Sequence, residues 1–144
     1  EMPKQFLSLC GEKDTLIAST VERMKKLTDI KNIFIVTGKD YYDITCKQLP
    51  SLPKENIICE PIGKNTTACI GYSAQIIKKR YGDAIMMVVP SDHVIKDTDA
   101  FASDLEKCCE IAEKGNTIVT VGITPTRPET GLGYIKLQKT MLKD

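Results

Sequence analysis

Three polar loops that follow apolar runs hold the side chains that could do chemistry. Residues 60–67 (EPIGKNTT) combine a carboxylate, a glycine, a lysine and hydroxyl groups, residues 90–93 (PSDH) carry an aspartate beside the single histidine, and residues 125–134 (PTRPETGLGY) combine Arg, Glu and two glycines. In open parallel sheets, ligands bind beyond the carboxyl ends of the strands. The sequence therefore predicts that these loops lie along one edge of a sheet.

Asp92 is the candidate metal ligand. It follows the apolar run 85–89 and Pro90, so it is expected to emerge at the end of a strand. A carboxylate there can hold a hard cation such as Mg²⁺, which prefers oxygen ligands and often uses one or two carboxylates together with substrate phosphates. The alternative is that Asp92 caps a turn, a common role of aspartate. His93 alone is more often a packing or hydrogen-bonding residue than a ligand.

Residues 63–67 precede a helical pattern, where backbone N–H groups can receive an anion or the polar edge of a base. The simpler interpretation is a helix start with Asn65 as its N-cap. The spacing matches neither a phosphate-binding G-x-x-x-x-G-K-[ST] loop nor a dinucleotide-binding G-x-G-x-x-G motif. Taken singly, Lys4 is a surface lysine, and Gly131 and Gly133 shape a turn.

The elements that must position these loops alternate between helix and strand. Helical periodicity covers residues 15–28, 40–49, 66–81 and 97–114, and short apolar runs predict strands at 32–37, 56–60, 84–89, 117–121 and 134–137. Asp14 is placed to cap the first helix, and Gly82 to end the helix over 66–81. Continuous apolar strands that alternate with helices favour an α/β fold, with a mainly parallel sheet covered by helices on both faces.

Residues 1–144 are expected to form part of a single domain. The chain opens in a loop with no strand before it and stops on a polar run soon after the last predicted strand. Because a sheet of this type usually begins with a strand, we expect a fragment that is incomplete at both ends.

Composition narrows the class of protein. The net charge of +1 argues against a nucleic-acid-binding surface, and no apolar run approaches the roughly 18 residues of a membrane span. The polar residues 1–5 do not resemble a signal peptide. Six cysteines without a C-x-x-C pair argue against a zinc site. We expect reduced cysteines in a cytoplasmic protein, with Cys10, Cys59 and Cys69 as small buried hydrophobes.

Four motifs in register resemble a known family. PKQFL at 3–7, EPIGKNT at 60–66, PSDH at 90–93 and TRPETGLGYI at 126–135 are similar to the motifs of mannose-1-phosphate guanylyltransferases, which are sugar-phosphate nucleotidyltransferases. Each motif alone is weak, but the four together span nearly the whole chain in the right order. The first and third favour this branch over nucleotidyltransferases for other sugars. The resemblance implies a Rossmann-like nucleotidyltransferase fold and the reaction of GTP with mannose 1-phosphate to give GDP-mannose and pyrophosphate, with Mg²⁺.

The resemblance also implies roles for individual residues. Lys4 matches the catalytic lysine that contacts phosphate, and Asp92 matches the catalytic aspartate that binds the metal. The positions that match the nucleotide-binding stretch are Glu60, Pro61, Gly63, Asn65, Thr66, Ser91 and Asp92. The positions that match the sugar-binding loop are Glu129, Gly133 and Tyr134. The implied partners are GTP and mannose 1-phosphate, with no nucleic acid and no membrane, and a homodimer stays open.

The sequence departs from the family pattern at both ends. A glycine-rich loop with an arginine, shortly before the PKQ motif, is absent, as are later segments that supply a second metal carboxylate. We therefore expect residues 1–144 alone to be inactive or nearly so.

Other interpretations of the function stay open. A non-catalytic sugar-nucleotide-binding domain would need neither Lys4 nor Asp92, so the presence of both argues against it. The same chemistry with another nucleotide and sugar 1-phosphate is also open, because the guanine preference rests on the resemblance. An unrelated Rossmann-like module would need a glycine fingerprint or a redox cysteine pair, and neither occurs.

Overall fold

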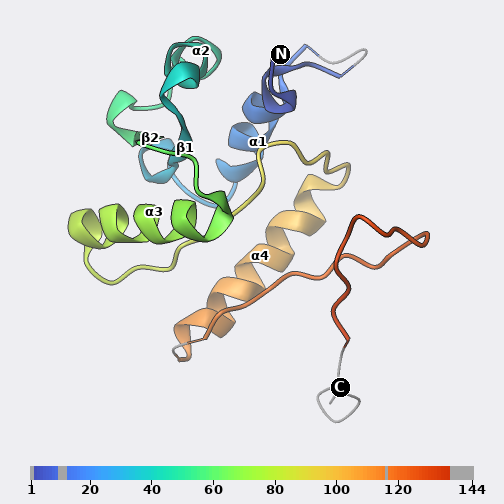
Figure 1. The fold of residues 1–144 in the computed structure, drawn as a ribbon. Helices are drawn as coiled ribbons and strands as arrows, with labels where there is room; N and C mark the ends of the chain where they lie inside the picture. Colours follow the sequence, from blue (N-terminus) through green and yellow to red (C-terminus); the bar gives the residue numbers. More distant parts are fainter. Residues whose placement is uncertain (1, 10–12, 116, 137–144) are drawn as a thin grey trace.

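The structure, a computed structural model, describes residues 2–9, 13–115 and 117–136 (Figure 1). Its longer elements are α1 (Leu16–Met24), β1 (Ile35–Gly38), α2 (Tyr42–Gln48), β2 (Ile57–Glu60), α3 (Asn65–Tyr81) and α4 (Thr98–Glu113). Short 3-10 turns lie at η1 (Lys4–Phe6), η2 (Ile30–Asn32), η3 (Lys39–Tyr41) and η4 (Lys54–Asn56). The predicted α/β class with a parallel sheet is confirmed. Among the described residues, no helix is both long enough and apolar enough to cross a membrane.

The strands β1 and β2 form a parallel pair, in a register that runs from Ile35 opposite Ile57 to Gly38 opposite Glu60. Parallel neighbours need a crossover connection, and here the crossover contains α2. Figure 1 shows the two strands between α2 on one side and α3 on the other. As a result, both strands end at the same edge of the sheet, and the loop that begins at Pro61 leaves from that edge.

A single apolar cluster holds the helices against the strands. Its buried members are Phe6, Ile17, Val21, Met24, Ile33, Leu49, Leu52, Ile57 and Leu105. The α1 members recur at a helical spacing, so one face of that helix is buried. Met87, Val89 and Phe101 pack against the cluster from outside the sheet. Each fully buried apolar side chain of this size stabilises the fold by about 1.5–3 kcal/mol.

The observed helix ends match the predicted ones in part. The predicted cap at Asp14 is wrong, since Thr15 is the N-cap of α1 and no side chain caps the helix. The Thr15 hydroxyl instead donates to Oε1 of Gln48 at 2.8 Å. The helix also ends at Met24, earlier than predicted. Gly82 ends α3 as predicted, with a φ of 77° that suits glycine.

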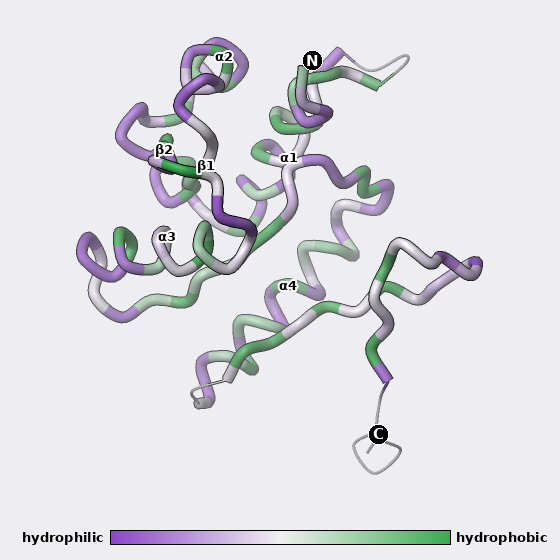
Figure 2. Tube along the Cα trace, viewed as in Figure 1, coloured by the Kyte–Doolittle hydropathy of each residue, from purple (hydrophilic) through white to green (hydrophobic). Residues whose placement is uncertain are grey.

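Three of the predicted strands are wrong. Residues 84–89, 117–121 and the described part of 134–137, residues 134–136, have no regular secondary structure; residue 137 lies outside the described residues. Figure 2 shows hydrophobic stretches of chain between α3 and α4 and after α4. Several apolar side chains in these segments are exposed, such as Val88 at 54% and Ile118 at 93%. An extended segment becomes a strand only when a neighbour accepts its backbone hydrogen bonds. Apolar composition predicted the extended conformation but could not supply that neighbour.

The side-chain amide of Asn56 joins the beginnings of both strands to α3. Asn56 is 2% exposed, and its Nδ2 donates to the carbonyls of Lys31 at 2.7 Å and Ile33 at 2.9 Å. Its Oδ1 accepts from Nη1 of Arg80 at 2.8 Å. The Arg80 guanidinium also donates to the Glu55 carbonyl at 2.7 Å and lies 5.3 Å from the Phe34 ring centre. The amide thus uses both donors and its acceptor to join its own segment to two others, residues 31–33 and α3.

We expect Asn56→Ala to lower the free energy of unfolding by about 1–3 kcal/mol, because it leaves two carbonyls and an arginine arm without a buried partner. Urea denaturation followed by circular dichroism measures the change. Asn32→Ala is the matched control, since among the described residues the Asn32 side-chain amide bonds only a neighbouring surface hydroxyl, Thr28 Oγ1, at 3.2 Å. The control should change stability by no more than about 0.5 kcal/mol. Equal losses in the two variants would contradict the role of the buried amide.

Candidate functional site

A cleft of about 850 Å³ opens between β1, α3 and the extended segment 84–92. Its walls are mostly apolar, with side chains of Val36, Ile70, Ile77 and Met87 among them. Its polar residues include Gln5, Thr66, Ser91 and Asp92, which come from three of the motifs found in the sequence. The fold therefore brings motifs separated by more than eighty residues of sequence to one cleft.

Asp92 lies in a turn at the end of the extended segment, with its side chain exposed. Ser91 beside it is half-buried, and both line the cleft. Within the described residues, no group of three or more His, Cys, Asp or Glu side chains is arranged to hold a metal ion. Mg²⁺ commonly takes one or two carboxylates and completes its shell with waters and substrate phosphates. A single exposed carboxylate at a cleft fits that kind of site and does not fit an all-protein cage.

Lys4 lies on η1, exposed, and the next two residues, Gln5 and Phe6, line the cleft. The turn is held from two sides. Nε2 of Gln48 donates to the Phe6 carbonyl at 3.1 Å, and the Phe6 side chain is buried in the core cluster. The motif of Lys4 is thus fixed at the cleft through Gln5 and Phe6, but Lys4 itself is exposed and is not one of the residues that line it.

The loop between β2 and α3 places its residues unevenly. Glu60 is the last residue of β2 and is half-buried, and Pro61, Gly63 and Asn65 are exposed. None of these four residues lines the cleft. The cap predicted at Asn65 is wrong, because Lys64 is the N-cap and no side chain caps α3. Asn65 itself has a φ of 59°, in the left-handed region that asparagine tolerates better than most residues. Of this motif, Thr66 reaches the cleft.

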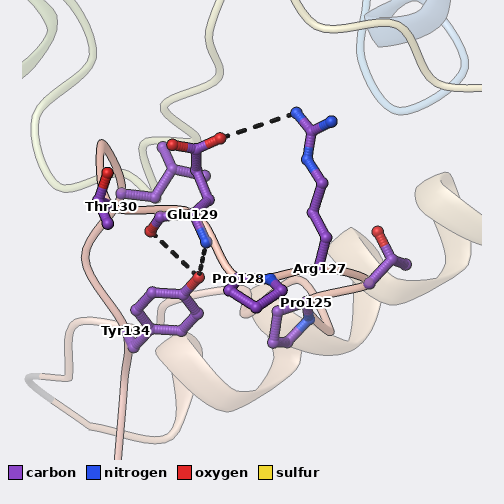
Figure 3. A pocket seen from close by; sticks show the side chains of 8 residues that line it. Pro125, Arg127, Pro128, Glu129, Thr130 and Tyr134 are labelled. Carbon is purple, nitrogen blue, oxygen red and sulfur yellow. Dashed lines mark hydrogen bonds and ion pairs between the residues drawn. The ribbon is translucent and has the colours of Figure 1, made fainter.

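The third loop forms a separate hollow of about 740 Å³, lined by residues 125–130, Leu132 and Tyr134. The Tyr134 hydroxyl accepts from the Glu129 N–H at 2.7 Å and donates to the Glu129 carbonyl at 3.2 Å (Figure 3). Oε1 of Glu129 accepts from the Gly131 N–H at 3.1 Å, and Oε2 lies 3.7 Å from Nη2 of Arg127. The predicted sugar residues Glu129 and Tyr134 are therefore in contact, and Gly133 lies between them in sequence.

Cys69 lines the cleft although it was expected to be a buried core residue. It is half-buried on α3, one turn after Thr66, and a spacing of three along a helix places two residues on one face. That spacing was the signal for its place in the cleft. Burial raises the pKa of the Cys69 thiol, and the negative charge of Glu60 raises this pKa further. The other described cysteines, Cys46, Cys59, Cys108 and Cys109, are also free thiols, and Cys10 lies outside the described residues.

Comparison with known proteins decides the family. The profile of a family described as nucleotidyl transferase matches residues 1–142. The chain belongs to the nucleotidyl transferase family. This membership confirms the resemblance found in the sequence and agrees with the Rossmann-like α/β fold.

Named relatives agree with the family. This nucleotidyl transferase is 38% identical to the mannose-1-phosphate guanylyltransferase of Escherichia coli K12 over 93% of the chain, and 35% identical to that of Sinorhizobium fredii over 98%. It is also 38% identical to the alginate biosynthesis protein AlgA of Pseudomonas fluorescens over 94% of the chain. The chain spans about 28% of the length of each of these three relatives.

We expect alkylation of Cys69 by iodoacetamide to reach half its maximal rate at a higher pH than that of an unstructured cysteine, because a raised pKa leaves less thiolate at a given pH. Glu60→Gln should lower this midpoint pH, since the variant lacks the negative charge that disfavours the thiolate. The midpoint should still stay above that of an unstructured cysteine, because the thiol remains partly buried. Mass spectrometry of the labelled peptide measures the rate, and the protein unfolded in urea is the control. A midpoint equal to the unfolded one would contradict the placement of the thiol.

Proposed function

We propose that the whole protein transfers the guanylyl group of GTP to mannose 1-phosphate, giving GDP-mannose and pyrophosphate with Mg²⁺. The observation that carries the proposal is the meeting of the PKQFL, GKNT and PSDH motifs at one cleft. The names of the relatives support the substrates. In this reaction an oxygen of the sugar phosphate bonds to the α-phosphorus of GTP, while the bond from that phosphorus to the pyrophosphate oxygen breaks.

Catalysis of this transfer depends mainly on aligning the two substrates and neutralising their phosphate charges, because both reactants are anions. Lys4, next in sequence to the cleft-lining Gln5, would contact phosphate and stabilise the charge that develops in the transition state. Asp92 would hold Mg²⁺, which supplies charge neutralisation of the phosphates when bound. Glu60, Pro61, Gly63, Asn65, Thr66 and Ser91 are the residues proposed to bind the nucleotide.

The loop 125–134 is the proposed sugar site, with Glu129, Gly133 and Tyr134 in contact with mannose 1-phosphate. Carboxylate and hydroxyl groups are suitable partners for sugar hydroxyls, and the Tyr134 hydroxyl already fixes the Glu129 backbone. A Cβ atom at position 133 would meet none of the described residues within 4 Å, apart from its chain neighbours, so packing among them does not require this glycine. A close approach of substrate to the backbone is the proposed reason for it.

The cellular setting follows from the same proposal. Residues 1–144 would be part of one catalytic domain. The protein would be cytoplasmic, because its charged substrates GTP and mannose 1-phosphate do not cross a membrane unaided. The free thiols of the described cysteines suit a reducing compartment.

We expect Asp92→Asn in the whole protein to lower turnover at least about 100-fold, because the metal contributes several kcal/mol of charge stabilisation. Lys4→Gln should lower turnover by a similar factor, since it removes a cation from the transition state. Pyrophosphate release, measured with four nucleoside triphosphates and several sugar 1-phosphates, tests both variants. Turnover of the unchanged protein should be greatest with GTP and mannose 1-phosphate.

Lys79→Gln is the matched control, because Lys79 is exposed on α3 and belongs to none of the motifs. Its turnover should stay within about twofold of the unchanged protein. A folded protein with no turnover on any pair would favour the non-catalytic sugar-nucleotide-binding domain. Turnover with a different pair would keep the chemistry and overturn the substrates.

We expect residues 1–144 by themselves to be inactive or nearly so. The hollow at 125–134 and the cleft at Asp92 share no lining residue, so the described residues do not form one continuous site for the two proposed substrates. Proximity of this kind accounts for much of the rate of a bimolecular transfer. Pyrophosphate release by residues 1–144 at a rate near that of the whole protein would contradict this expectation.

A further inference from the structure

Arg23 is a buried arginine in the last turn of α1 whose side chain reaches the turn that carries Asp92. The residue is 7% exposed. Its Nη2 donates to the Thr20 hydroxyl at 3.0 Å and lies 3.5 Å from the carbonyl of His93, the residue directly after Asp92. The guanidinium carbon lies 5.5 Å from the centre of the Phe101 ring on α4. One side chain therefore contacts α1, α4 and the PSDH turn.

The contacts of Arg23 differ from those of an arginine kept for an ion pair. The ion pairs found among the described residues do not include it, and its buried Nε has no hydrogen-bond partner there. Burial lowers the pKa of Arg23, which reflects the cost of taking the charge out of water. An apolar side chain could fill the space between α1 and α4 without that cost. What the arginine adds is a charged donor directed at the PSDH turn.

The donor is itself held in place. The Thr20 hydroxyl is buried and donates to the Leu16 carbonyl at 2.9 Å, so its lone pairs face the guanidinium. Beyond His93, the chain is fixed again where Oδ1 of Asp97 accepts the Ala100 N–H at 2.9 Å and starts α4. Before it, Val89 packs on the core cluster. The turn at 90–93 is therefore anchored on both flanks, and among the described residues Arg23 is the side chain that donates to its backbone.

We propose that Arg23 is a positioning residue, which holds the PSDH backbone through the His93 carbonyl and so keeps the Asp92 carboxylate aimed at the cleft. The inference rests on the proposed function, in which Asp92 binds the metal. Arg23 touches neither substrate nor metal. Its loss would weaken metal binding because Asp92 would have to be ordered at the moment of binding.

The experiment measures Mn²⁺ binding to the whole protein in the presence of GTP, from the electron paramagnetic resonance signal of free Mn²⁺. Arg23→Met keeps the length and apolar contacts of the side chain but removes the donor. We expect its dissociation constant for Mn²⁺ to rise about fivefold, less than the loss of a short charge-assisted hydrogen bond would give, because the distance from Arg23 Nη2 to the His93 carbonyl is 3.5 Å. Arg23→Lys keeps a charge without the forked geometry, and we expect a rise of about threefold. It provides the same test if Arg23→Met does not fold.

Arg80→Met is the matched control. Arg80 also stacks on a phenylalanine ring and donates to a backbone carbonyl, but its contacts lie with Phe34, Glu55 and Asn56 at the other end of the sheet. We expect Arg80→Met to lower the melting temperature and to leave the Mn²⁺ dissociation constant within about twofold. Equal weakening in Arg80→Met and Arg23→Met would show a general loss of stability and overturn the positioning role.

Asp92→Asn separates the inference from the function on which it rests. If Asp92→Asn weakens Mn²⁺ binding and neither Arg23 variant does, the metal site stands and the role of Arg23 is overturned. If Asp92→Asn leaves Mn²⁺ binding unchanged, the proposed metal ligand is wrong and the inference fails with it. Weakening by Asp92→Asn and by Arg23→Met, with Arg80→Met unchanged, supports both.

Discussion

The buried amide of Asn56 is the interaction on which the arrangement of the sheet and α3 depends. Its Nδ2 bonds carbonyls that lead into β1, and its Oδ1 bonds an arginine at the carboxyl end of α3. An amide removed from water is costly unless its hydrogen bonds are made, so few alternative arrangements of these three segments are open. The carboxyl end of α3 is therefore held beside the segments that lead into β1 and β2.

The cleft exists because the extended segment 84–92 lies against the core without pairing with β1. Met87 and Val89 pack on the core cluster, while Val88 between them is exposed. This alternation is that of a strand, but no ladder of hydrogen bonds fixes the segment to its neighbour. The segment is therefore placed by side-chain packing, and its polar end at 90–93 needs further support. The contacts of Arg23 and the Asp97 cap provide support on the side that leads into α4.

The site residues differ in how firmly the fold holds them. The Lys4 turn is fixed by the buried Phe6 ring and by Gln48, and the Glu129 turn is fixed by the Tyr134 hydroxyl. Asp92, by contrast, is an exposed carboxylate whose backbone is held only through its neighbours. In the proposed function Asp92 would benefit from this combination, because its carboxylate oxygens stay free for the metal ion while the backbone is constrained.

The sequence by itself determined the family, the α/β class, the two paired strands to within a few residues, and which loops carry polar groups. These follow from local patterns, namely apolar periodicity, glycine at the end of α3 and motifs in a fixed order. It overestimated the sheet, since apolar runs at 84–89 and 117–121 predict extended chain whether or not a partner strand lies beside them. It also misplaced the caps at Asp14 and Asn65, where several polar residues stand together.

Only the tertiary structure decided which of these residues meet. Cys69 was expected in the core and lines the cleft, Arg23 joins α1 to a turn seventy residues later, and the loop 125–134 forms a hollow of its own. Contacts of this kind depend on how helices and loops pack in three dimensions, which no local pattern of residues encodes. The residue types therefore limit which chemistry is available, and tertiary packing decides which of these groups lie close enough to act together.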